Sequence, residues 1–337
     1  SYLKAASLDK DLSDKVDTQK AIIYYRQKRY KEAEQQFALN IEHQPQNYEN
    51  YLWRGRMHKA LKKYDQELAD FDHALLLAPG SIDTYKSKAM TLSEINKPKA
   101  ALHVVEQALD RQTQKSLELL EFKAFYQTDC AMYQEAIDTY NQAIALAPHA
   151  AALYLDRGIA YIYLDKYDEG LADCSMVLAL DPTRWEALVN LGTCYKAEGD
   201  YKQAIHCYKR ALLANPKWHD TYRALANCEF MIEDYASSIK DYTTALKYNP
   251  RSQILYINRG SARGAMGDYK GLLADTTIAH KLGKPTAVSL KNISIALNKL
   301  GQKEDSESKL RLALKDDPAA VANYISLATL LADKKPQ

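Results

Sequence analysis

Glycine and proline are scarce in this 337-residue sequence, with 12 and 10 residues respectively. Their scarcity favours helices and argues against a β-sandwich, which needs many turns. The chain also has almost no excess of charge of one sign, because 45 lysines and arginines face 43 aspartates and glutamates, for a formal net charge of +2. A nearly neutral chain lacks the basic surface of a nucleic-acid binder. We therefore expect no nucleic-acid partner.

Long apolar runs are absent as well. The most apolar stretch, residues 143–155, is short and is interrupted by Pro148 and His149. It cannot span a bilayer, so we expect no direct membrane insertion. The five cysteines are odd in number and include no C-x-x-C pair, which argues against a disulfide framework. The lack of a disulfide framework favours a reducing compartment, and no secretory signal is visible. We therefore expect a cytoplasmic location.

Motifs that carry chemistry are missing too. The sequence has no G-x-x-x-x-G-K-[ST] or G-x-G-x-x-G loop to hold phosphates, and no G-x-S-x-G or protein-kinase signature. A metal site needs clustered ligands at suitable spacing, and His206-Cys207, between Cys194 and His219, is a poor candidate. We therefore predict no catalytic residue, no metal site and no cofactor, and hence no enzyme.

Prolines and tyrosines recur with one period. Eight prolines are separated by 34, 69, 34, 34, 34, 35 and 33 residues: Pro45, Pro79, Pro148, Pro182, Pro216, Pro250, Pro285 and Pro318. Seven tyrosines step by 34, 69, 34, 34, 34 and 34 residues: Tyr30, Tyr64, Tyr133, Tyr167, Tyr201, Tyr235 and Tyr269. The interval of 69 is two periods plus one residue. Two residue types that give the same period independently indicate internal repeats.

Each repeat contains two segments whose apolar residues have helical spacing. In residues 185–218 the two segments are separated by Gly199 and Asp200, and Pro216 closes the unit because proline does not fit a helix interior. One such hairpin cannot bury its apolar face alone, whereas stacked copies can. The unit resembles the tetratricopeptide repeat in the following residues: Leu191, Gly192, Tyr195, Tyr201, Ala204, Tyr208, Ala211 and Pro216.

The resemblance covers nearly the whole chain and implies an all-α fold, a right-handed α-α superhelix. We expect nine units: 14–47, 48–81, 82–115, 116–149, 151–184, 185–218, 219–252, 253–286 and 287–320. Residues 1–13 match the end of a preceding repeat, so we expect a parent protein that is longer at its N-terminus. Residues 321–337 are expected to form a capping helix and a polar tail. Cys174, Cys194 and Cys228 occupy small core positions of the repeat, so we expect them to pack in the core.

In this family the first helices line a concave groove. The resemblance implies that the fifth unit presents a mostly apolar set to it: Leu155, Asp156, Ile159, Ile162 and Tyr163. The later units present more polar side chains. Among these we predict a peptide-binding set: Asn190, Arg223, Asn227, Asn258, Lys291 and Asn292.

Arg223, Asn227 and Asn258 also match, in type and spacing, part of a clamp with which some family members bind the C-terminal carboxylate of a chaperone. The last two clamp positions hold Val288 and Asn292 in place of basic residues, so we do not expect tight binding of a chaperone tail. Asparagine amides and an arginine can still orient a peptide backbone or one carboxylate. The alternative that Arg223 and Asn227 are only solvated surface residues stays open.

Arg-Gly pairs recur at residues 54–55, 157–158 and 259–260. We expect the glycine to serve helix packing and the arginine to form hydrogen bonds or ion pairs between repeats.

These observations predict a protein–protein interaction scaffold that holds a peptide segment or helix of a partner in its groove. The alternatives are a co-chaperone or targeting receptor that reads a C-terminal tail, the repeat region of a larger enzyme, and a structural subunit of a trafficking, ciliary or secretion complex.

Overall fold

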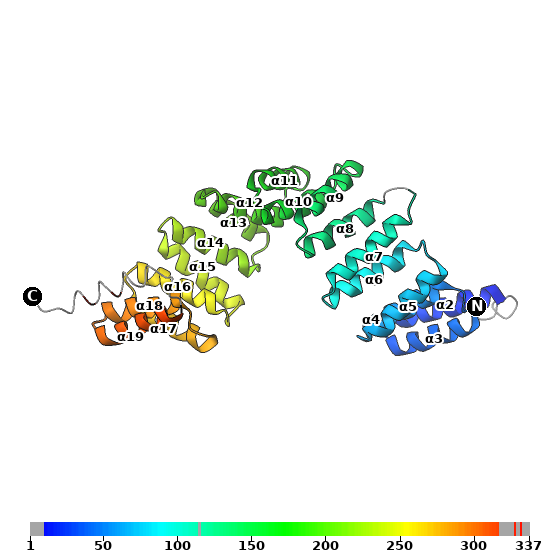
Figure 1. The fold of residues 1–337 in the computed structure, drawn as a ribbon, viewed down its shortest axis with the longest axis horizontal. Helices are drawn as coiled ribbons and strands as arrows, with labels where there is room; N and C mark the ends of the chain where they lie inside the picture. The colour runs from blue at the N-terminus through cyan, green and yellow to red at the C-terminus, as the bar shows by residue number, and fades with distance from the viewer. Residues whose placement is uncertain (1–9, 114–115, 317–326, 328–330, 332–337) are drawn as a thin grey trace, which may run out of the picture. The chain divides into compact units, whose positions relative to one another are not determined.

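The computed structural model describes residues 10–113 and 116–316, together with Leu327 and Leu331. Within these residues it contains 18 α-helices in consecutive pairs and no strand (Figure 1). The all-α prediction is therefore confirmed. Most of the expected capping helix at 321–337, and residues 1–9 of the expected preceding repeat, lie outside the described part of the chain.

The chain divides into two units, residues 1–164 and 165–337. The first unit contains these helices: α2 (Lys10–Arg26), α3 (Tyr30–His43), α4 (Tyr48–Ala60), α5 (Tyr64–Leu77), α6 (Ile82–Glu94), α7 (Pro98–Asp110), α8 (Leu117–Asp129), α9 (Tyr133–Leu146) and α10 (Ala151–Tyr163). Each helix from α2 to α10 packs against the next one in the chain.

The second unit continues the same pattern with these helices: α11 (Tyr167–Leu180), α12 (Trp185–Ala197), α13 (Tyr201–Ala214), α14 (His219–Met231), α15 (Tyr235–Tyr248), α16 (Gln253–Ala265), α17 (Tyr269–Leu282), α18 (Ala287–Lys299) and α19 (Lys303–Asp316). Consecutive helices from α11 to α19 are again in contact. The first helices of neighbouring pairs, α12 with α14, α14 with α16 and α16 with α18, also touch.

The recurring tyrosines mark the starts of second helices. Each of the seven is the first residue of its helix, in α3, α5, α9, α11, α13, α15 and α17. In α7 this position is taken by Pro98, which fits the first helical turn because no intrahelical bond is lost there. Several first helices are capped by side chains instead, as where Ser116 accepts from the Leu119 N–H and begins α8.

The turn inside every helix pair contains one residue with a left-handed backbone. Three of these residues are glycines with φ of 83–84°, namely Gly199, Gly267 and Gly301. Six are not glycine and have φ of 58–64°: Lys28, Lys62, Asn96, Ala131, Asp165 and Glu233. A left-handed residue after a helix C-terminus reverses the chain, and only glycine adopts it without steric cost.

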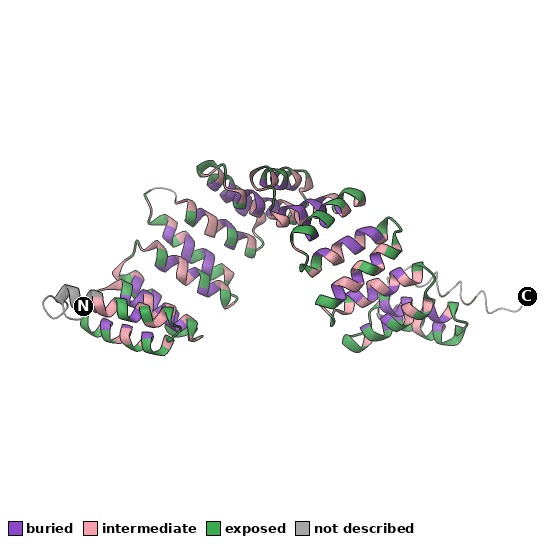
Figure 2. Ribbon diagram, turned by 180° about the vertical axis from the view of Figure 1, so that it is seen from behind, coloured by how far each residue is buried: buried purple, intermediate pink, exposed green. Residues whose placement is uncertain are grey.

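Small residues bring the two helices of a pair together. A Cβ on Gly192 in α12 would lie 2.6 Å from Cε1 of Tyr208 in α13, a fully buried ring. A Cβ on Gly55 in α4 would meet Phe71 of α5 at the same distance. Figure 2 shows buried residues in each of the helix pairs. These glycines are therefore required by packing and not by backbone conformation.

The cysteines at repeat core positions are buried, as the repeat spacing predicts. Cys174, Cys194 and Cys228 each have no exposed surface. Burial raises the pKa of Cys174 and Cys194 to about 12 and that of Cys228 to about 11. Such thiols stay protonated at neutral pH and behave as small apolar groups.

The arginines of the Arg-Gly pairs form bonds both within a helix pair and between neighbouring pairs. Arg54 and Arg259 bond chiefly to an aspartate of the second helix in their own pair, Asp70 and Asp275 respectively. Contacts between pairs exist beside this: Arg259 Nη1 donates to Thr243 of α15 at 3.1 Å, and Arg157 donates to Asn141 of α9 at 2.5 Å. The expected bonds between repeats are thus present at Arg157 and Arg259, whereas the bonds of Arg54 and Arg259 to an aspartate within their own pair are not predicted by the repeat pattern.

Candidate functional site

Two of the predicted peptide-binding asparagines meet in the second unit. Nδ2 of Asn258 in α16 donates to Oδ1 of Asn227 in α14 at 3.3 Å. The same oxygen accepts a hydrogen bond from the hydroxyl of Tyr242 in α15. Tyr242 is 2 % exposed, and burial raises its pKa to about 12, so it remains a hydrogen-bond donor at neutral pH. The Asn227 amide is thereby held from two sides.

The next pair of helices repeats this link with different residues. Nδ2 of Asn292 in α18 donates to Oγ of Ser261 in α16 at 2.8 Å. In each case the two linked residues are 31 apart in the chain. The four residues Asn227, Asn258, Ser261 and Asn292 therefore connect three successive first helices, and we call them the amide row. Asn292 is buried, whereas Asn227 and Asn258 are half-buried and open to a partner.

The other predicted residues are not drawn into this row by hydrogen bonds. The Arg223 side chain is 42 % exposed and lies 3.5 Å from Asp220 Oδ1, one turn earlier in α14. Among the described residues, Asn190 in α12 and Lys291 in α18 have no hydrogen bond or ion pair to another side chain. The structure thus joins two of the six predicted residues directly, Asn227 and Asn258, and links Asn292 to the same helix α16 through Ser261.

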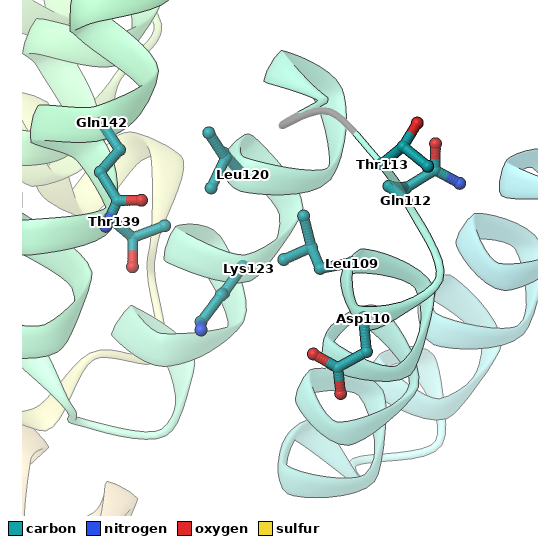
Figure 3. A pocket seen from close by; sticks show the side chains of 8 residues that line it. All are labelled: Leu109, Asp110, Gln112, Thr113, Leu120, Lys123, Thr139 and Gln142. Atoms are coloured by element: carbon teal, nitrogen blue, oxygen red, sulfur yellow. The ribbon is translucent and has the colours of Figure 1, made fainter.

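A first cavity, of about 260 Å³, lies in the first unit where α7, α8 and α9 meet. Figure 3 shows Lys123 of α8 and Gln142 of α9 on one side of it, and Asp110 and Gln112 at the end of α7 on the other. The cavity lies beside the α7–α8 connection, where the repeat is one residue longer, because α8 begins 35 residues after α6. Its lining mixes apolar and polar side chains.

A second cavity, of about 350 Å³, is formed by α8, α9 and α10. Its lining is aromatic and acidic: Phe125, Thr128, Asp129, Tyr133, Tyr140, Asp156, Ile159 and Tyr163. Three of these residues, Asp156, Ile159 and Tyr163, belong to the set that the resemblance assigns to the groove. The sequence reasoning missed Phe125 and Asp129 because the groove positions of the fourth unit were not read, and it took Tyr133 only as one of the recurring tyrosines. Phe125 and Asp129 lie 34 residues before Ile159 and Tyr163, so the repeat spacing finds them, whereas Tyr133 begins a second helix and has no such signal.

The described part of the chain holds no group of three or more His, Cys, Asp or Glu residues placed to bind a metal ion. None of its helices combines the length and the apolar character that crossing a membrane requires.

Comparisons with known proteins agree on the repeat. Residues 132–184 and residues 185–217 match family models described as tetratricopeptide repeat. A protein of Oryza sativa subsp. japonica named Protein SGT1 homolog is 40% identical over 55 residues. That match spans 16% of this chain and only 15% of the rice protein.

Solved structures show the same fold at low identity. A tetratricopeptide repeat protein from Parabacteroides merdae is 20% identical with a TM-score of 0.54, and the match covers 73% of this chain and 97% of that one. The C-terminal part of a TPR repeat-containing protein from Cytophaga hutchinsonii is 17% identical with a TM-score of 0.56, covering 72% and 98%. Residues 132–217 thus contain tetratricopeptide repeats, and the 34-residue period and the paired helices extend the same fold along the described chain. Proteins with this repeat generally act as protein–protein interaction scaffolds.

Proposed function

We propose that this protein is an interaction scaffold that holds a peptide segment of a partner protein along the first helices α14, α16 and α18. The observation that carries the proposal is the hydrogen bond between Asn258 and Asn227. It uses one donor of Asn258 and one acceptor of Asn227. The Nδ2 group of Asn227 and the Oδ1 atom of Asn258 have no partner among the described residues.

These two unpaired groups, the Asn227 NH₂ and the Asn258 amide oxygen, match the hydrogen-bonding groups of a peptide backbone. An unpaired amide NH₂ donates to a carbonyl, and an unpaired amide oxygen accepts from an N–H, which are the two groups that each peptide unit offers. Because Tyr242 and Asn258 already hold the Asn227 amide, little side-chain freedom remains to be lost on binding. A fixed amide pair therefore supports recognition of an extended segment through its main chain.

A peptide backbone fits this surface better than a C-terminal carboxylate does. The Arg223 guanidinium already has the Asp220 carboxylate 3.5 Å away, which offsets its charge. Val288, which occupies a position where the clamp needs a cation, is 58 % exposed and apolar. A carboxylate bound here would find amides but little net positive charge. We therefore assign Arg223, Asn190 and Lys291 to the rim of the proposed site and not to a charge clamp.

The test compares the wild-type chain with an Asn227→Ala/Asn258→Ala variant in capture from a native lysate, followed by binding of synthetic peptides from the captured protein. Losing two backbone hydrogen bonds should weaken peptide binding roughly tenfold. N-methylation of the contacted peptide residue should weaken binding to the wild type and leave binding to the variant unchanged, because both changes remove the same bonds.

A matched control removes polar groups from the second helices. Gln203→Ala/Lys240→Ala changes exposed residues of α13 and α15. This control should bind as the wild type does. Equal peptide affinity of the wild type and the Asn227/Asn258 variant, with thermal unfolding unchanged, would overturn the proposed site.

A further inference from the structure

The cavity between α8, α9 and α10 has walls of two kinds. Tyr133 at the start of α9 and Tyr163 at the end of α10 stack face to face, with ring centroids 4.8 Å apart and planes inclined by 8°. Phe125 of α8 lines the same cavity. Tyr163 is 61 % exposed and Phe125 is 49 % exposed, so these rings keep free surface although they surround a hollow.

The polar wall is acidic. Asp129 ends α8, and Asp156 lies on α10, and both line the cavity. The negative charges of these aspartates act on a side chain that lines the cavity. After burial, the charge of Asp156 is the largest cause that raises the pKa of Tyr140, and the charges of Glu121 and Asp129 raise it further. No lysine or arginine is among the residues that line the cavity. The nearby Arg157 bonds to Asn141 and lies over the rings of Tyr154 and Tyr161.

Aromatic rings with exposed surface beside carboxylates complement a cation. A cation over a tyrosine face is attracted by the ring quadrupole, and the attraction grows where water is partly excluded. A guanidinium suits this site better than an ammonium because it is planar, stacks on rings and can donate two parallel bonds to one carboxylate. An apolar side chain here would desolvate the Asp129 carboxylate without offering it a hydrogen bond.

We propose that this cavity receives an arginine side chain of a partner protein. Tyr133 and Tyr163 provide the ring faces, and Asp129 provides the carboxylate that the guanidinium meets. The site lies in the first unit and shares no residue with the amide row of the second unit. The two proposals can therefore fail independently.

The probe for this site is N-acetyl-arginine methylamide, compared with its neutral near-isostere N-acetyl-citrulline methylamide. Binding to the full chain is followed by saturation-transfer NMR on the probe. The arginine probe should bind with a Kd on the order of 1 mM, which suits a single side-chain anchor. The citrulline probe should bind at least about fivefold more weakly because it lacks the charge.

Two variants locate the binding. Asp129→Asn and Tyr163→Ala should each weaken binding of the arginine probe about fivefold. Asp65→Asn, the same charge change at an exposed residue of α5, is the control and should have no effect. Thermal unfolding of each variant reports whether the fold is kept.

Three outcomes would overturn the proposal. Equal binding of the arginine and citrulline probes would mean that the cavity does not select a positively charged side chain. Unchanged binding to a folded Asp129→Asn chain would place the probe elsewhere. Equal weakening by Asp65→Asn and Asp129→Asn would mean that the probe responds only to the overall charge of the chain.

Discussion

Arg259 in α16 holds both carboxylate oxygens of Asp275 in α17, with Nε–Oδ2 and Nη2–Oδ1 distances of 2.9 and 2.7 Å. Arg54 and Asp70 form the same fork in the first unit, at 2.9 and 2.6 Å. The Asp275 and Asp70 side chains are only 2 % and 7 % exposed. Each fork therefore fixes the two helices of a pair to one another at a buried position.

Removing one partner of this fork should be costly. Asp275→Ala leaves Arg259, whose side chain is 12 % exposed, without its carboxylate, so we expect about 3 kcal/mol lower stability in urea unfolding. Asp72→Ala breaks an exposed ion pair with Lys88 and should cost less than about 1 kcal/mol. Similar losses for the two variants would contradict the role given to the buried fork.

A methyl group at Gly192 should destabilise the α12–α13 pair. Gly192→Ala places Cβ against the buried ring of Tyr208, and the clash should exceed the gain in helix propensity and cost about 1–2 kcal/mol. Gly80→Ala, where nothing lies within 4 Å of the added carbon, should be nearly neutral. Thermal unfolding of both variants tests the packing explanation, which a neutral Gly192→Ala would refute.

Replacing a non-glycine residue that has a left-handed backbone by glycine should stabilise the folded protein. Ala131 sits between α8 and α9 with φ of 59°. Ala131→Gly relieves this strain at some cost in unfolded-chain entropy, so we expect a gain of about 0.5–1 kcal/mol in urea unfolding. The reverse change at an equivalent turn, Gly199→Ala at φ of 84°, should lose stability. A loss in the first variant would show that its turn differs from the others.

Titration of the Glu229 carboxyl group should lower the free energy of unfolding as pH rises. Its side chain in α14 is 1 % exposed, and burial raises its pKa to about 7, against the opposing effect of Lys209, 3.1 Å away. The folded state then keeps a proton that the unfolded state releases near pH 4.5. Stability from this group is therefore full below about pH 4.5 and is lost as pH rises to about 7, by on the order of 1 kcal/mol per pH unit.

Glu229→Gln removes this titration and should flatten the stability profile between pH 5 and 7, measured by urea unfolding at several pH values. Asp241 lies beside Glu229 and remains in the variant, and its pKa is also raised by burial. The exposed Glu233→Gln serves as control and should keep the wild-type slope. If the slope of Glu229→Gln equals that of the wild type, another group controls the pH dependence.

The periodic features of the fold could be predicted from the sequence because they follow from local chemistry. Proline positions and the tyrosines that begin second helices repeat wherever the same helix boundary repeats. Burial of Cys174, Cys194 and Cys228 followed from the same frame, since a small residue is needed wherever two helices approach. The candidate peptide-binding set stays a prediction, although Asn227 and Asn258 are found hydrogen-bonded to one another.

Contacts between distant positions could not be predicted in this way. That Arg259 bonds to Asp275 depends on which helix faces its guanidinium, and a repeat pattern gives no such direction. Likewise, the repeat pattern gives Tyr133 only as a helix start and Tyr163 as a groove residue, and it does not show that their rings stack or that both line one cavity with Asp129. By itself, then, the sequence determined the helices, their period and their core faces, because these depend on residues close together in the chain. Only the tertiary structure decided which polar and aromatic side chains meet, because such meetings depend on how successive helices pack.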